Sequence, residues 1–259
     1  MADTDVVPDS GVPALLTPTP GASPATSGAG EMSLVDHLSE LRNRLVRVIL
    51  AVAIASSVGF ILGDQIVAIL KAPIPGDDPL YFTGIGDAFV IKLKIAVVVG
   101  IILAMPVILW QVWGFIAPGL TADERRIVRP WLPLALVFFL LGTGIAYLIL
   151  PFAAGFLIGF ETPDLKALIT AGAYFDFVTT MFLAFGLIME FPILLFGLSR
   201  VGIVTSKRLV GARRMAILGI AIFATAITPG GDLVSPAALG VTMYLLFEGT
   251  IFFIRRSGK

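Results

Sequence analysis

Three glutamates stand beside or inside long apolar segments, and these side chains have the strongest potential for chemistry. Glu40 precedes the first apolar segment, Glu124 follows the second, and Glu190 interrupts the fourth. A carboxylate can form charge-assisted, bidentate hydrogen bonds with a guanidinium group. Glu40 and Glu124 would therefore suit a ligand that carries adjacent cations beside an apolar segment.

The segment around Glu40 has the pattern of an amphipathic helix that enters a membrane. Ser33 and Asp36 resemble a capping box, and leucines recur at positions 34, 38, 41 and 45. Asp36, Glu40 and Arg44 share the opposite face at four-residue spacing. The alternative to a binding site is a solvated face on which a Glu40–Arg44 pair contributes roughly 0.3–0.5 kcal/mol.

Glu124 lies in a short connection that Pro118 and Gly119 force to turn. Thr121 and Glu124 have the spacing of a capping box, so a helix should begin there. The alternative to a binding role for Asp123 and Glu124 is a helix cap within a solvated charge cluster.

Glu190 is the acid that lies well inside an apolar segment. Burying an ionisable group in hydrocarbon costs at least ~2.5 kcal/mol, so Glu190 should face a cavity or a partner. Pro192 is expected to kink the helix at this point. A purely structural role for Glu190 is the alternative. Glu248 is ambiguous, because Arg255 and Arg256 follow closely and its carboxylate can reach the interface.

Catalytic patterns are weak or absent from the sequence. Gly84-Ile85-Gly86-Asp87 fits the GxGD pattern of intramembrane aspartyl proteases, but no second intramembrane aspartate pairs with Asp87. The chain has no cysteine, a single histidine (His37) and no phosphate-binding loop. We expect no catalytic residues, no metal and no cofactor, so the protein is not expected to be an enzyme.

The elements that position these residues are membrane-spanning helices. The chain of 259 residues is 57% hydrophobic and 14% charged, which excludes a soluble protein. A span needs about 20 apolar residues. We expect an all-α integral membrane protein with a disordered tail at 1–31 and a membrane domain at 32–259. Its six spans are expected at about 45–63, 92–113, 129–151, 175–199, 213–228 and 236–254, with the last two short.

The distribution of basic residues predicts the orientation. Fourteen of the 18 Lys and Arg residues flank the N-terminus, the second connection, the fourth connection and the C-terminus. The positive-inside rule then places both termini in the cytoplasm. Because the net charge of the whole chain is zero, nucleic acid is not an expected partner.

A set of motifs in order along the chain resembles the TatC family, the multispanning subunit of the twin-arginine (Sec-independent) protein translocase. The motifs are His37-Leu38-Ser39-Glu40-Leu41-Arg42-Asn43-Arg44-Leu45, Ala72-Pro73, Phe115-Ile116-Ala117-Pro118-Gly119-Leu120 with Glu124-Arg125-Arg126, Phe185-Gly186 with Glu190 and Pro192, and Thr228-Pro229 with Asp232. The resemblance runs from about Ser33 to Arg256. It implies a concave, glove-shaped bundle of six helices in the bacterial cytoplasmic membrane.

The resemblance also implies a function. TatC-like proteins bind the twin-arginine signal peptides of folded cargo at the cytoplasmic face, and the complex exports that cargo using the proton-motive force. Carried over by position, Glu40 and Glu124 would pair with the two arginines of the signal peptide. Arg42, Phe115 and Leu120 would support that site.

Partner contacts follow from the same resemblance. Glu190 would lie on the concave membrane-embedded face, where a polar group of a single-span TatA or TatB subunit is expected, and Asp232 belongs to the same partner-binding set. Pro73 would brace the periplasmic side. Self-association in a receptor complex and contact with membrane lipid are also implied. One departure is that Pro236 stands where the family often has a glutamine.

The main alternative is a proton-coupled small-molecule transporter that uses Glu190 as its relay. Such carriers usually have internal repeats, discontinuous helices and several polar groups at the midplane. The sequence has one acid well inside a span and no visible repeat, so a receptor remains the better interpretation.

Overall fold

The computed structural model describes residues 34–74, 79–162, 164, 166, 168–200, 202, 204–228 and 233–256. The expected disordered tail at 1–31 and Asp232 lie outside the described residues. The chain divides into one unit that ends at Leu38 and a second unit, residues 39–259. The packing described below is that of the second unit.

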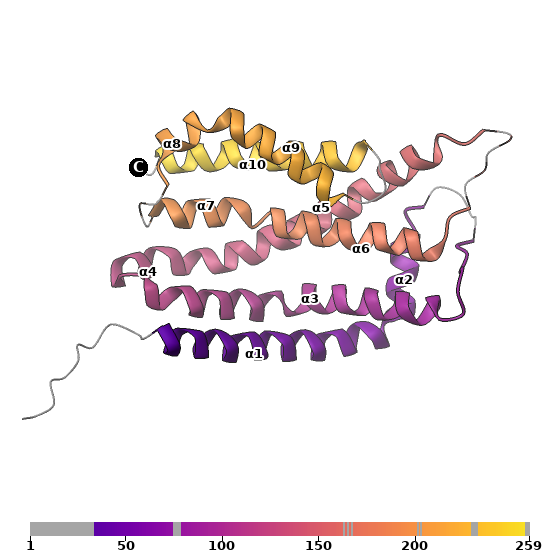
Figure 1. Cartoon of the computed structure of the whole chain (residues 1–259), viewed down its shortest axis with the longest axis horizontal. Coiled ribbons are helices and arrows are strands. Elements are labelled where there is room, and N and C mark those ends of the chain that lie inside the picture. The colour runs from indigo at the N-terminus through magenta and orange to yellow at the C-terminus, as the bar shows by residue number, and fades with distance from the viewer. Residues whose placement is uncertain are drawn as a thin grey trace, which may run out of the picture. The chain divides into compact units, whose positions relative to one another are not determined.

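Every regular element of the described residues is a helix (Figure 1), so the expected all-α class is confirmed. The α-helices are α1 (Leu34–Ile61), α2 (Gly63–Lys71), α3 (Asp87–Ile116), α4 (Ala122–Val128), α5 (Leu132–Ile158), α6 (Ala171–Ile188), α7 (Phe191–Arg200), α8 (Ser206–Gly211), α9 (Arg213–Ile227) and α10 (Val234–Arg256). Two short 3₁₀ helices, η1 (Ala117–Gly119) and η2 (Arg129–Trp131), flank α4.

Among the described residues, five helical segments are long and apolar enough to cross a membrane: Val35–Ile61, Asp87–Gly119, Ala122–Ile158, Ala171–Arg200 and Val234–Arg256. The fifth expected span, at about 213–228, corresponds to α9, which has 15 residues. At 1.5 Å per residue α9 is about 22 Å long, less than the ~30 Å of a hydrocarbon core. The expectation that the fifth span is short therefore agrees with the length of the helix. The same expectation for the sixth span is wrong, because α10 has 23 residues and is long enough to cross a membrane.

Helix α5 continues past the end that the sequence pattern suggested for the third span. The span was expected to end near Pro151, but α5 runs through this proline to Ile158. A proline removes one backbone hydrogen bond and often ends a helix. Here Leu150, Ala153 and Ala154 are buried on either side of it, so packing against neighbouring helices holds the helix together.

Helices α5 and α6 form the centre of the core. Their buried residues include Ala146, Leu150 and Ala153 of α5 and a run of residues from α6, together with Ile95 of α3 and Leu239 of α10. The two backbones approach closely where Gly142 faces the carbonyl of Phe185, and a Cβ at Gly142 would overlap that carbonyl. This close approach places the end of α6, and the following Glu190, against α5.

Polar contacts join several elements at the end of the bundle that holds α2. Tyr174 of α6 donates a hydrogen bond to the carbonyl of Leu70 at 2.6 Å. Lys92 of α3 pairs with Asp64 of α2 at 2.9 Å, and Lys94 pairs with Asp176 of α6. The connections before α3 and α6 are joined by a bridge between Tyr81 and Thr170. These contacts fix the starts of α3 and α6 relative to α2.

Candidate functional site

Glu40 already holds a guanidinium group in this structure. Nε and Nη2 of Arg44, one turn later on α1, donate to Glu40 Oε1 at 3.0 and 2.5 Å. The Glu40 side chain is 20% exposed and that of Arg44 is 21% exposed. The Glu40–Arg44 pair expected from the sequence is therefore present, and it is partly withdrawn from solvent.

Arg44 also connects α1 to α3. Its Nη1 lies 3.4 Å from Oε1 of Gln111. The guanidinium group lies so close to Gly114 that a Cβ at this position would overlap it. The Glu40 carboxylate is thus tied through Arg44 to the last turns of α3, immediately before Phe115.

Of the remaining residues predicted for the signal-peptide site, Phe115 and Leu120 lie at the end of α3. Arg42 is exposed on α1, whereas Phe115 is half-buried in the last turn of α3. Leu120 follows the 3₁₀ helix η1 and is half-buried. The chain turns tightly here because Arg125 donates two hydrogen bonds to the carbonyl of Ala117, at 3.2 and 2.6 Å.

Glu124 caps α4. Its Oε2 accepts a hydrogen bond from the backbone N–H of Thr121 at 2.9 Å, and its own N–H donates to Thr121 Oγ1 at 3.4 Å. These two bonds form the capping box that the sequence predicted. The cap interpretation of Glu124 is therefore correct, and it fixes the carboxylate in place beside Leu120.

An apolar cavity of about 280 Å³ lies between α3, α4, α5 and α7. Leu120 and Glu190, which the sequence assigned to separate sites, both line it. Its other lining residues are almost all apolar: Leu109, Val112, Trp113, Ile116, Val128, Trp131, Leu132, Ala135, Ile193, Leu194, Gly197 and Leu198. The structure thus brings the loop site and the embedded acid to one cavity.

Glu190 lies where the fourth span breaks. Helix α6 ends at Ile188 and α7 begins at Phe191, with Met189 and Glu190 between them. Pro192 has no N–H to continue the ladder of hydrogen bonds, which confirms the expected kink. Oε1 of Glu190 is buried and has no hydrogen-bond partner among the described residues. A ligand that supplies a donor could satisfy this oxygen.

Two contributors to the site were not assigned a role from the sequence. Gln111 of α3 contacts Arg44 of α1. Trp131 lines the cavity and stacks on Phe196 of α7, with ring centroids 3.9 Å apart. Both contacts join residues far apart in sequence, so no local pattern points to them.

Two further acids have structural partners. Glu248 pairs with Arg213 of α9 at 2.6 Å and accepts a hydrogen bond from Tyr244 at 3.3 Å. The nearby Arg255 and Arg256 of the sequence did not indicate this partner, because Arg213 lies on another helix. Asp87 accepts hydrogen bonds from Thr83 and Gly84 at the start of α3. It therefore organises a turn.

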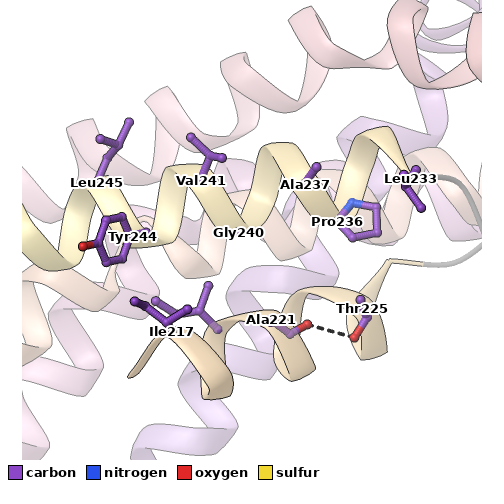
Figure 2. Close-up of a pocket in the computed structure, with 11 residues that line it drawn as sticks. Ile217, Ala221, Thr225, Leu233, Pro236, Ala237, Gly240, Val241, Tyr244 and Leu245 are labelled. Carbon is purple, nitrogen blue, oxygen red and sulfur yellow. Dashed lines mark hydrogen bonds between the residues drawn. The ribbon is translucent and has the colours of Figure 1, made fainter. Parts of the chain in front are cut away.

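A second, larger groove of about 720 Å³ runs between α9 and α10 (Figure 2). Figure 2 shows Ile217, Ala221 and Thr225 of α9 facing Gly240 and Tyr244 of α10. Thr225 donates its hydroxyl hydrogen to the carbonyl of Ala221 at 2.8 Å, so the groove is almost wholly apolar. Pro236, the position that departs from the family, also lines this groove.

Pro73 stands apart from these residues, in the turn that follows α2, and it is half-buried. In the described part of the chain no three His, Cys, Asp or Glu residues cluster in a way that could hold a metal ion. The chemistry available at the site is therefore hydrogen bonding, ion pairing and apolar contact.

The chain is similar to known proteins along most of its length. Residues 36–241 match the family model described as TatC, Sec-independent protein translocase protein. The TatC protein of Carboxydothermus hydrogenoformans is 34% identical over 226 residues, which cover 86% of this chain and 93% of that protein. The TatC protein of Azotobacter chroococcum is 39% identical over 229 residues, covering 86% and 89%.

A solved structure is also similar. A crystal structure described as the twin arginine translocase receptor TatC has a TM-score of 0.75 and 33% sequence identity to this chain. The match covers 86% of this chain and 100% of the other.

Proposed function

Because the chain belongs to the TatC family of Sec-independent protein translocase proteins, we propose that it is the receptor subunit for twin-arginine signal peptides. As a TatC protein it is an integral membrane protein and a transport protein rather than a catalyst. In this proposal it binds the signal peptides of folded cargo and, with partner subunits, exports that cargo using the proton-motive force.

The observation that carries the proposal is the contact between Glu40 and Arg44. Two nitrogens of one guanidinium group approach Glu40 at 3.0 and 2.5 Å, so this carboxylate is positioned to accept a planar, forked donor. A guanidinium group offers that geometry and an ammonium group does not. An arginine of the signal peptide would take the position of Arg44 or join it.

A second arginine would reach Glu124. This carboxylate is held by the Thr121 cap through Oε2, which restricts its rotamer and so lowers the entropy lost on binding. Leu120 lies between Glu124 and the cavity lined by Trp113 and Glu190. The apolar segment that follows the two arginines of a signal peptide would therefore have apolar surface beside it.

Partner subunits would use the embedded surfaces. Glu190 carries a buried oxygen that lacks a hydrogen-bond partner among the described residues, and a polar group on a single-span TatA or TatB subunit would supply one. The groove between α9 and α10 is apolar along its length, so it suits the side of a single transmembrane helix. In this proposal Asp232 also contacts a partner subunit, and Pro73 braces the periplasmic side of the protein.

The orientation is also part of the proposal. At the end of the bundle that holds α2, Lys92 and Lys94 are each paired with an aspartate. Most of the other lysines and arginines flank the opposite end of the bundle. By the positive-inside rule that opposite end, with Glu40, Glu124 and both termini, faces the cytoplasm. Self-association in the receptor complex would occur within this one orientation.

The test is photo-crosslinking of a peptide that carries Arg-Arg before an apolar segment to the full chain in membranes. The Glu40→Gln and Glu124→Gln variants keep side-chain size but lose charge. Because a charge-assisted hydrogen bond contributes about 1.5–3 kcal/mol, each variant should lower peptide affinity by roughly 10-fold or more. A Lys-Lys peptide should crosslink much less than the Arg-Arg peptide to the unaltered chain.

Asp123→Asn is the matched control, because Asp123 is exposed next to Glu124 and takes no part in the capping box. Its peptide affinity should stay within about twofold of the unaltered chain, as expected for a solvated charge. Equal crosslinking of the Arg-Arg and Lys-Lys peptides would show that the site assignment is wrong.

A further inference from the structure

An apolar groove lies on the outside of the bundle between α5, α7 and α10. It has a volume of about 300 Å³ and is lined by Trp131, Leu134 and Phe138 of the α5 region, Pro192 and Phe196 of α7, and Leu245, Leu246, Gly249, Thr250 and Phe253 of α10. Trp131 also lines the cavity beside Glu190, and Leu245 also lines the α9–α10 groove, but the other lining residues belong to neither site.

The groove occupies one half of the membrane thickness. On α10 its lining begins at Leu245, the centre of the helix, and ends at Phe253. These eight residue steps correspond to about 12 Å of helix. One leaflet of a bilayer contributes about half of the ~30 Å hydrocarbon core, or roughly 15 Å. The groove therefore has the length of one leaflet and does not continue into the other.

Arginines lie near one end of the groove on α7, on α10 and in η2, which precedes α5. Phe196 lines the groove, and Arg200 one turn later places its guanidinium 4.8 Å from the Phe196 ring centroid. Phe253 lines it too, and Arg256 follows three residues later on the same helix face. On the third helix Trp131 is preceded by Arg129 in η2. We call this surface the arginine-capped groove.

The interior of the arginine-capped groove offers no polar group to a ligand. Its one hydroxyl, Thr250 Oγ1, donates to the carbonyl of Leu246 at 2.7 Å, and no lining residue is charged. The acid nearest in sequence on α10, Glu248, is paired with Arg213. Residues 199–214, which follow Phe196, contain five basic residues and no acid. Basic residues thus outnumber acidic ones at this end of the apolar channel.

We propose that the arginine-capped groove binds one anionic phospholipid of the leaflet on the basic side. Its acyl chain lies along Phe138, Leu246 and Gly249, and its phosphate lies at Arg200 and Arg256. Basic pockets between transmembrane helices are known to bind anionic lipid headgroups. Trp131 lies at the level where an indole ring prefers the membrane interface.

The length and the charge of the groove favour a lipid over a partner helix. A transmembrane helix needs about 20 residues of contact surface, whereas this groove extends over one leaflet only. A free phosphate would use the arginines and leave the apolar channel empty. A phospholipid fills both parts at once.

Quenching of Trp131 fluorescence by lipids with brominated acyl chains tests the proposal. The chain has three tryptophans, so Trp110→Phe and Trp113→Phe leave Trp131 as the only emitter. The full chain is reconstituted in phosphatidylcholine nanodiscs that contain brominated phosphatidylglycerol or, at equal mole fraction, brominated phosphatidylcholine. Each arginine near a membrane surface should favour the anionic lipid by roughly fivefold, so two should give about 25-fold selectivity.

Two variants separate the headgroup from the acyl chain. Arg200→Gln with Arg256→Gln should reduce the selectivity to about one. Gly249→Leu should lower quenching by both lipids, because Gly249 lines the groove and faces open space that the new side chain would fill. Gly219→Leu, at an open glycine in a different pocket, is its control and should leave quenching unchanged.

Three results would overturn the proposal. Equal quenching by the two lipids in the unaltered chain would show that the arginines do not select a headgroup. An equal loss of selectivity in Lys207→Gln with Arg208→Gln would assign the effect to diffuse surface charge. Quenching that appears only with a bromine-labelled transmembrane peptide would make the groove a helix-docking site.

Discussion

Glu40 and Glu124 at the surface and Glu190 within the fourth span obtain their hydrogen-bond partners from different sources. The two surface carboxylates are engaged by the chain itself, Glu40 by Arg44 and Glu124 by Thr121. Glu190 keeps one buried oxygen without a partner among the described residues. A ligand at the surface must therefore compete with the protein's own groups, whereas a ligand at Glu190 supplies something that is missing.

The largest effect is expected at Glu190. Replacing it with Leu removes the hydrogen-bonding group, and an interaction with a buried polar group typically contributes about 1–3 kcal/mol. Co-purification of a tagged TatA- or TatB-type subunit should fall by roughly 5- to 150-fold, while crosslinking of the Arg-Arg peptide should be retained.

Glu190→Gln is the matched variant, because its amide keeps both an acceptor and a donor. It should retain much of the partner binding that Glu190→Leu loses. Loss of peptide binding with normal partner binding would instead assign Glu190 to the signal-peptide site.

A smaller effect of opposite sign is expected at Arg44. Arg44→Ala removes the guanidinium group that occupies Glu40, and a partly exposed ion pair contributes about 0–1 kcal/mol. Affinity for the Arg-Arg peptide, measured by fluorescence anisotropy in detergent, should rise by up to roughly fivefold.

Arg47→Ala is the control for Arg44, because Arg47 is exposed on the same helix and should change affinity little. A fall in affinity in Arg44→Ala would contradict the competition model. In that case the contacts of Arg44 with Gln111 and Gly114 would matter more than its occupation of Glu40.

The smallest effect on binding is expected at Thr121. Thr121→Ala removes the side-chain half of the capping box, which costs about 1 kcal/mol of helix stability. Peptide affinity should fall, but by a smaller factor than the rise expected for Arg44→Ala. The carboxylate of Glu124 remains available to the peptide and only becomes more mobile. Thermal unfolding in detergent and peptide anisotropy measure the two effects.

Thr205→Ala provides the comparison, since Thr205 caps α8 through the same hydrogen bond, to the N–H of Arg208 at 3.4 Å. It should cost similar stability without changing peptide affinity. Equal loss of peptide binding in both variants would show that the effect comes from general destabilisation.

Local features could be predicted from the sequence, and contacts between distant elements could not. The capping box at Thr121 and the kink at Pro192 depend on residues within one turn, so their patterns were sufficient. The continuation of α5 through Pro151 depends on packing, which outweighs a local helix breaker. The meeting of Leu120 and Glu190 in one cavity depends on how α3, α4, α5 and α7 are arranged, and no single segment carries that information.

The continuity of α1 has a mechanical consequence. Leu34 to Ile61 form one uninterrupted helix of 28 residues, about 42 Å long and so longer than the ~30 Å hydrocarbon core. Only 6% of its most apolar stretch is buried in protein, so lipid surrounds most of it. Glu40 therefore lies near the end of a helix that must tilt or extend beyond the core, and the contact of Arg44 with Gln111 couples that tilt to α3. A thicker or thinner membrane would change the tilt of α1 and α3 together and so move the carboxylate relative to the surface.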